Sequence, residues 1–218
     1  MELIQKQNNA VFYLKDKVTK EVIYGGAAGG GKSALGVLWL IEQCQTYPNT
    51  RWLMGRAKLK ALRETTLNTF FELSSRFDLN SQYRYNSQSG VIYWNNGSEI
   101  LLKDLFTYPS DPNFDSLGSL EITGAFIDEC NQISFKAWQI VKSRIRYKLK
   151  EYNLTPKMLG SCNPSKNWVY TKFYLPSEEN RMDIDKRFIQ ALPTDNPHLP
   201  KSYLESLLSL DEASKQRL

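Results

Sequence analysis

The residues with the clearest chemistry form a glycine-rich segment near the amino terminus. The segment Gly26-Ala27-Ala28-Gly29-Gly30-Gly31-Lys32-Ser33 follows an apolar run and precedes a helical pattern. Glycines let consecutive backbone N–H groups turn inward around a phosphate, and the start of a helix adds partial positive charge. Lys32 would neutralise the β- and γ-phosphates, and Ser33 would offer its hydroxyl to Mg²⁺. The spacing therefore predicts a P-loop that binds ATP and Mg²⁺ through these eight residues.

Two adjacent carboxylates follow a second apolar run, Gly124-Ala-Phe-Ile, at Asp128 and Glu129. We expect Asp128 to hold Mg²⁺, mainly through its water ligands, and Glu129 to polarise the attacking water as general base. A second acid beside the first favours hydrolysis over transfer to a small substrate. Asn163 ends a further apolar run and is placed to contact the γ-phosphate; alternatively, it caps a turn before Pro164.

A parallel sheet is needed to bring these residues together. Short apolar runs alternate with helical patterns, which predicts an α/β fold with a central, mainly parallel sheet flanked by helices. We expect strands at 21–24, 52–54, 125–127 and 158–162, and helices at 5–16, 33–45, 59–77, 135–150 and 201–218. Runs at 91–94 and 99–103 flank Asn95-Asn-Gly97 and predict an inserted β-hairpin. We place the ATPase core at 1–190 and a loop and helix at 191–218.

Composition narrows the functional classes. The chain of 218 residues has a net charge of +5, which permits a polyanionic partner without demanding one. It shows neither an amino-terminal signal pattern nor an apolar run long enough to span a bilayer, so we expect it to act in a cytoplasm. Its single histidine and three separated cysteines do not have zinc-site spacing.

These segments, in this order, resemble the ATPase domain of the large terminase subunit of tailed bacteriophages. The resemblance covers nearly the whole chain; its Walker A and B segments are generic, but their order together with an Asp-Asn-Pro segment is more specific. It rests on GGAAGGGKS, Leu53-Met-Gly-Arg56 followed by Leu62-Arg-Glu, Glu121 to Glu129, Gly160-Ser-Cys-Asn163-Pro164 and Asp195-Asn-Pro-His-Leu-Pro. Gln7, five residues before Phe12, is similar to the family's adenine-recognising glutamine.

The resemblance implies a P-loop NTPase of the additional-strand (ASCE) type. In that family, ATP hydrolysis drives double-stranded DNA into a procapsid, with the portal protein and the small terminase subunit as partners. The large subunits form a ring at the portal, in the host cell cytoplasm. We expect a monomer in isolation, and no nuclease activity, because too few residues follow Pro164 for the family's nuclease domain.

The sequence departs from the family in its arginines. Some members carry one inside the P-loop, where Ala27 and Ala28 stand here, and others just before the Walker B strand, where 116–120 holds no basic residue. The charge must be supplied from elsewhere, in the same or a neighbouring subunit. The candidates are Arg56, Arg144 and Arg146, each of which could instead be a surface or phosphate-contacting arginine.

A basic ridge is predicted on the helix at 135–150. Lys142, Arg146 and Lys150 recur at every fourth position and could follow a DNA phosphate backbone; the alternative is a solvated helix face. Two other functions stay open: another DNA-dependent P-loop ATPase, such as a helicase-like motor, and a nucleotide-dependent assembly module without turnover.

Overall fold

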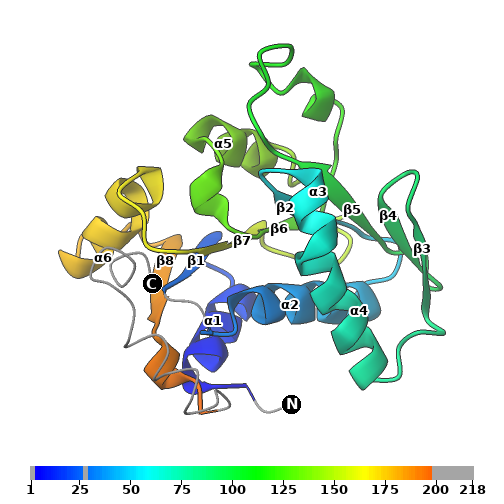
Figure 1. Cartoon of the computed structure of the whole chain (residues 1–218), viewed down its shortest axis with the longest axis horizontal. Coiled ribbons are helices and arrows are strands. Elements are labelled where there is room, and N and C mark those ends of the chain that lie inside the picture. The colour runs from blue at the N-terminus through cyan, green and yellow to red at the C-terminus, as the bar shows by residue number, and fades with distance from the viewer. Residues whose placement is uncertain (1–2, 27–28, 198–218) are drawn as a thin grey trace.

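One eight-stranded sheet organises the chain. The computed structural model describes residues 3–26 and 29–197. The strands lie in the order β3-β4-β5-β2-β6-β7-β1-β8 (Figure 1). From β5 to β8 neighbouring strands pair in parallel, whereas β3 and β4 continue the sheet in antiparallel pairing. The strands are β1 Glu21–Gly26, β2 Arg51–Arg56, β3 Tyr83–Asn86, β4 Val91–Trp94, β5 Glu99–Asp104, β6 Gly124–Ile127, β7 Lys157–Cys162 and β8 Lys186–Ala191.

Helices cover both faces of this sheet. Figure 1 shows α1, α2 and α4 on one side of the strands and α5 on the other. The helices are α1 Gln5–Lys15, α2 Lys32–Thr46, α3 Leu59–Glu64, α4 Thr66–Arg76, α5 Phe135–Ser143 and α6 Leu175–Glu178, with a π-helical turn at Tyr170–Tyr174 before α6. Among the described residues, no helix is long and apolar enough to cross a membrane.

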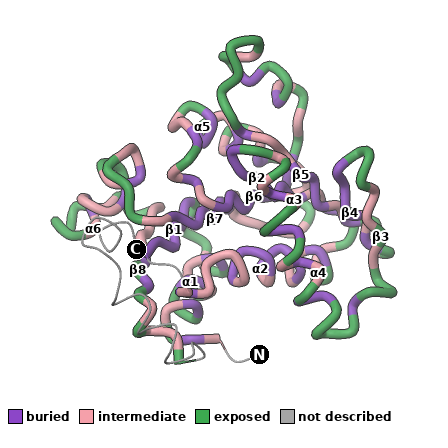
Figure 2. The backbone as a smooth tube through the Cα atoms, in the orientation of Figure 1, coloured by how far each residue is buried: buried purple, intermediate pink, exposed green. Residues whose placement is uncertain are grey.

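The central strands are apolar throughout because both of their faces are buried. Successive side chains of a strand point to opposite faces. Val22 and Tyr24 belong to the core cluster that includes residues of α1, α2 and α4, while Ile23 between them belongs to the cluster that includes residues of α5. The strands at the middle of the sheet are accordingly buried along their length (Figure 2).

The α/β fold with its parallel sheet and β4–β5 hairpin confirms the prediction from sequence. The helix predicted at 59–77 is instead two helices, because Thr65 leaves the helical region with φ −126° and ψ −77°. Strands β3 and β8 were not predicted. Every residue of β3 is only partly buried or exposed, so the apolar signal of a core strand is missing there.

The prediction of one helix over 135–150 is wrong, and the basic ridge on it is wrong as well. Helix α5 ends at Ser143, because the following residues pair with the segment before β6: Ile145 bridges Ile122, whose carbonyl accepts the Arg146 N–H at 2.9 Å. Arg146 and Lys150 therefore do not continue the face of α5 that carries Lys142.

Two of these basic side chains are also engaged in ion pairs within the chain. Lys142 binds the buried carboxylate of Glu21, and Arg146 pairs with Glu121 at 3.0 Å. Other predictions, including the helix at 201–218 and the contacts of Ala27 and Ala28, lie outside the described residues.

At the carboxyl edge of the sheet, the ends of β1, β2, β6 and β7 meet.

Candidate phosphate and carboxylate site

The glycine-rich loop depends on glycine at both ends. Gly26 closes β1 with φ 134°, and a Cβ there would meet the Ala191 carbonyl oxygen at 1.9 Å. Gly31 precedes α2 with φ 68°, and a Cβ there would meet the Gln7 amide nitrogen at 2.6 Å. Lys32 begins α2 and its Nζ donates to the Gly26 carbonyl at 2.9 Å. The lysine thus reaches back across the loop.

Side chains from α1, from β1 just before the loop and from the distant Asn196 hold the carbonyl groups of this loop. Gln7 on α1 donates to the Gly31 carbonyl at 3.0 Å, and Tyr24 on β1 donates to that of Gly30 at 3.3 Å. Asn196 donates to the Gly29 carbonyl at 2.5 Å. In a trans peptide the N–H points away from the C=O. The contacts on the Gly29, Gly30 and Gly31 carbonyls therefore direct the N–H groups of Gly30, Gly31 and Lys32 to the other side, as a phosphate cradle requires.

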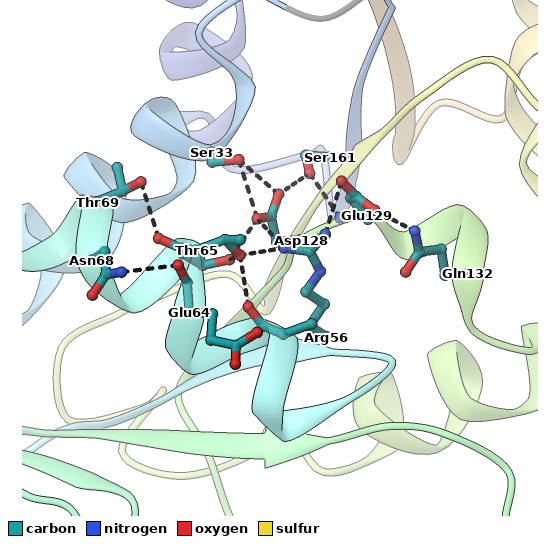
Figure 3. Close-up of polar contacts among 12 residues, drawn as sticks. Ser33, Arg56, Glu64, Thr65, Asn68, Thr69, Asp128, Glu129, Gln132 and Ser161 are labelled. Atoms are coloured by element: carbon teal, nitrogen blue, oxygen red, sulfur yellow. Dashed lines mark hydrogen bonds and ion pairs between the residues drawn. The ribbon is translucent and has the colours of Figure 1, made fainter. Parts of the chain in front are cut away.

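Asp128 lies across from the loop and is the most heavily hydrogen-bonded carboxylate of the site. It follows β6, is 2% exposed, and accepts three hydroxyl groups, of which those of Ser33 and Ser161 are labelled in Figure 3. Ser33 contacts its two oxygens at 3.0 and 3.1 Å, Thr66 donates to Oδ2 at 2.6 Å, and Ser161 donates to Oδ1. The first residues of α2 and the end of β6 are thereby joined.

Glu129 is held in a different way. Its backbone is left-handed, with φ 49° and ψ 51°, and its N–H donates to Ser161 Oγ at 2.9 Å. Its carboxylate forms an ion pair with Arg56, with 2.9 Å between Oε1 and a terminal guanidinium nitrogen, and accepts the Gln132 amide. The other terminal nitrogen of Arg56 lies 4.0 Å from Asp128 and donates to Thr65. Arg56 thus lies between the two acids.

The donor set fits a nucleotide-bound magnesium ion. The Ser33 hydroxyl, at the end of the glycine-rich loop, contacts the Asp128 carboxylate, and Mg²⁺ typically takes few protein ligands beside phosphate oxygens and water. No group of three His, Cys, Asp or Glu side chains suited to a metal occurs in the described part of the chain. Burial lowers the pKa of the Lys32 ammonium, and the acidic groups around it oppose that shift.

Comparison with known proteins decides the family. A family model described as phage terminase large subunit matches residues 17–217. The chain belongs to the phage terminase large subunit family. No curated protein sequence matches it.

Solved terminase structures share the fold of this family member. The large terminase from a thermophilic bacteriophage superposes with a TM-score of 0.73 at 13% identity, over 99% of this chain and 52% of that one. The Thermus phage P74-26 large terminase ATPase domain gives 0.68 at 15% identity, over 95% and 89% of the two chains. The N-terminal domain of the bacteriophage phi29 DNA packaging ATPase gives 0.57 at 13% identity, over 90% and 99%. The fold is therefore that of an additional-strand P-loop NTPase, and the chain spans about half the length of the first of these three proteins.

The predicted site residues of this terminase chain fall into two places. Gln7, Gly26, Gly29 to Ser33, Asp128, Glu129 and Arg56 lie together at the carboxyl edge of the sheet. Arg144 and Arg146 lie instead beside Ile122, which precedes the first residue of β6, whereas Asp128 follows the last residue of that strand. At roughly 3.3 Å per strand residue, this separation along β6 is about 20 Å. Of the three candidate arginines, only Arg56 is at the site of its own chain.

Asn163 lies beside the loop at the end of β7. Its N–H donates to Asn131 Oδ1 at 3.4 Å, and it lines a cavity of about 310 Å³ together with Gly26, Tyr170 and Phe188. This position is compatible with a contact to a nucleotide on the loop. Gln7 is buried, and its amide oxygen accepts the Ile4 N–H at 3.1 Å while its amide nitrogen donates to the Gly31 carbonyl. In this structure the Gln7 amide therefore supports the loop.

Sequence reasoning missed three residues that shape the site: Thr65, Thr66 and Ser161. No helical or strand period marks them as polar ligands. Ser161 and Asn196 each lie within a segment on which the family resemblance rests, and that resemblance is the available sequence signal for these two residues.

Proposed function

We propose that this chain is the ATP-hydrolysing motor domain of a phage DNA-packaging machine. The observation that carries the proposal is the contact of Ser33, at the end of the glycine loop, with the Asp128 carboxylate, while Glu129 lies in the next position. Related proteins bind nucleotides: the large terminase from the thermophilic bacteriophage was solved in complex with ADP and with ATP-γ-S.

Each residue has a separate role in this proposal. The loop N–H groups bind the β-phosphate, and Lys32 neutralises β- and γ-phosphate oxygens. Ser33 and Asp128 hold Mg²⁺, which when bound offsets the negative charge of the phosphates. Glu129 orients the attacking water and accepts its proton. Asn163 contacts the γ-phosphate from the end of β7.

Glu129 must change partners to act as a base. Its carboxylate is bound by Arg56 and Gln132. These two contacts engage both oxygens of the carboxylate and fix it in place. The ion pair between Arg56 and Oε1 therefore opens before a water can be polarised from that oxygen. Arg56 is then free to turn its charge toward the phosphates.

The ion pair between Glu129 and Arg56 favours a second candidate function, a nucleotide-dependent assembly module that binds ATP without turnover. In that case the Arg56–Glu129 pair persists with nucleotide bound. Binding without phosphate release, in the presence of DNA and at ring-forming concentrations, is the result that distinguishes this candidate.

Family membership supports double-stranded DNA as the substrate of the motor, with the portal protein and the small terminase subunit as partners. We propose that the chain is a monomer in isolation, forms a ring on the procapsid, and acts in the host cell cytoplasm. We assign no DNA-contacting surface, because Lys142, Arg146 and Lys150 do not form the ridge that suggested one.

The test is phosphate release by the purified chain, with and without duplex DNA. We expect Mg²⁺-dependent release that rises with DNA and is lost in Lys32→Ala. Lys15→Ala is the matched control, since Lys15 is an exposed lysine paired with Glu42 on the surface. Release that persists in Lys32→Ala would contradict the proposal. Light scattering of the same sample measures its molar mass in solution and so tests whether the isolated chain is a monomer.

A further inference from the structure

We propose that Thr66 is a positioning residue for Asp128, fixing the carboxylate that holds the magnesium ion. The inference rests on the proposed function and adds a residue to it. Thr66 is fully buried, and its hydroxyl oxygen lies 2.6 Å from Asp128 Oδ2. It comes from neither nucleotide motif; it is the first residue of α4, separated from Asp128 by 62 positions along the chain.

The hydrogen bonds around Thr66 fix the direction of its proton. The neighbouring Thr65 hydroxyl donates to the Ala61 carbonyl at 2.7 Å and accepts from Arg56, so its own proton is used. The two threonine hydroxyls are 3.4 Å apart. Thr66 is therefore left to donate to Asp128, and an ionised carboxylate can only accept.

The three hydroxyls on Asp128 are not equivalent. Ser33 lies between both carboxylate oxygens, whereas Ser161 donates to Oδ1 and Thr66 to Oδ2. Ser33 is also the residue proposed to hold Mg²⁺; its single proton is shared between the two Asp128 oxygens, and the lone pairs of its own oxygen are left for the metal. Thr66 and Ser161 add one donor each, on Oδ2 and Oδ1 respectively. A carboxylate offers about four lone-pair sites, so acceptor positions remain for the water ligands of a metal.

A break between two helices delivers this hydroxyl. Helix α3 ends at Glu64, Thr65 takes a non-helical conformation, and α4 restarts at Thr66. The break brings the Thr65 hydroxyl to Arg56 (Figure 3). It also brings the Thr66 hydroxyl to Asp128. The interruption that the sequence pattern did not predict thus has a function at the site.

The experiment compares nucleotide affinity with and without magnesium. A fluorescent, non-hydrolysable ATP analogue is titrated into wild type, Thr66→Val, Thr66→Ala and Thr66→Ser, once in Mg²⁺ and once in EDTA. We expect the magnesium-dependent gain in affinity to fall about 10- to 100-fold in the valine and alanine variants, the usual effect of losing an outer-shell partner. Thr66→Ser should restore it, and affinity in EDTA should stay at the wild-type value in all variants.

The control is Thr69→Val, which removes a hydroxyl from the same helix that donates to the Thr65 carbonyl instead of Asp128. An unchanged magnesium effect in Thr66→Val or Thr66→Ala overturns the inference, as does a failure of both to fold while Thr66→Ser folds, because the hydroxyl would then be purely structural. Wild type that binds no analogue in Mg²⁺ would instead contradict the proposed function, and the inference would fall with it.

Discussion

Among single residues, two neighbouring carboxylates have been given opposite surroundings. Asp128 is buried and hydrogen-bonded by three neutral hydroxyl donors, with the nearest Arg56 nitrogen 4.0 Å away. Glu129 is paired with the charged Arg56, and its backbone takes a left-handed conformation. The same chemical group can therefore serve as a metal ligand in one position and as a base in the next.

Arg56 tests this division. In Arg56→Ala, Glu129 loses its charged partner beside a second carboxylate, so its position is no longer defined. We expect kcat to fall roughly 10- to 100-fold, the range of a misplaced general base, with nucleotide affinity near the wild-type value. Steady-state kinetics and an equilibrium titration measure the two quantities.

Arg51→Ala is the matched control for Arg56, because Arg51 begins the same strand and pairs with Glu99 at 3.0 Å, away from the site. An Arg56→Ala enzyme with the kcat of Arg51→Ala would show that the guanidinium does not place Glu129.

The sequence allowed part of this site to be predicted, for a physical reason. Lys32, Ser33, Asp128 and Glu129 stand in contiguous segments whose local chemistry already implies their roles. Thr66 and Ser161 acquire theirs only when the sheet order brings β7 and the start of α4 against β6. Contacts made across such distances leave no local pattern.

Among secondary-structure elements, the position of the loop depends on how closely α2 approaches the sheet. Gly36 on α2 lies against Phe126 of β6, and a Cβ there would meet the ring at 2.2 Å. This close packing brings Ser33, one turn earlier on α2, to the end of β6.

Gly36→Ala should therefore destabilise the protein although alanine is the better helix former. The expected loss of unfolding free energy is about 1–3 kcal/mol from overpacking, more than the ~1 kcal/mol gained in helix propensity. Urea denaturation measures it. Adding Phe126→Leu should recover part of the loss, and a Gly36→Ala protein as stable as wild type would contradict the packing.

A second set of contacts fixes α1 to the sheet. The Lys157 ammonium on β7 is buried and binds Asp16 at 2.8 Å and the Tyr13 carbonyl at 2.8 Å. Burial alone would raise the pKa of Asp16, but the hydrogen bonds from Lys157 and Thr19 lower it to about 2. Because the folded-state pKa is below the unfolded value, the stabilisation is present above about pH 4 and is lost as the pH falls toward 2.

Asp16→Asn should lower the unfolding free energy by about 1–2 kcal/mol at pH 7, and by much less at pH 2. Chemical denaturation at both pH values measures the difference. Glu64→Gln is the control, since Glu64 forms an exposed pair with Lys60 at 3.8 Å. An equal loss at both pH values would exclude a role for the Asp16 charge.

Element prediction failed where tertiary contacts overrode local period. The residues at 135–150 have the spacing of a helix, yet the chain after Ser143 pairs with Ile122, and Lys148 takes a positive φ of 53°. Strand pairing satisfies backbone groups that a longer helix would have satisfied internally. Strands with two buried faces were predicted well because their apolar runs need no partner to be recognised.

For the whole molecule, the site joins parts of the chain that are far apart in sequence: α1 and Asn196 hold the loop, and α4 and β7 hold Asp128. A ligand that contacts all of these parts should stabilise the entire fold. At 100 times its Kd a ligand adds about 2.7 kcal/mol, which for a domain of this size corresponds to about 5–10 °C in Tm.

We expect that rise with a non-hydrolysable ATP analogue and Mg²⁺, measured by calorimetry, and no rise for Lys32→Ala under the same conditions. A rise of equal size in Lys32→Ala would mean that the analogue binds elsewhere.

The central claim is that Glu129 is the base of an ATP-hydrolysing site. The direct measurement is phosphate release by Glu129→Gln, with analogue binding in Mg²⁺ determined on the same preparation and Glu99→Gln as the arginine-paired control. We predict that release falls at least about 100-fold while binding is retained. Release near the wild-type rate, from a variant that binds the analogue normally, would contradict the account.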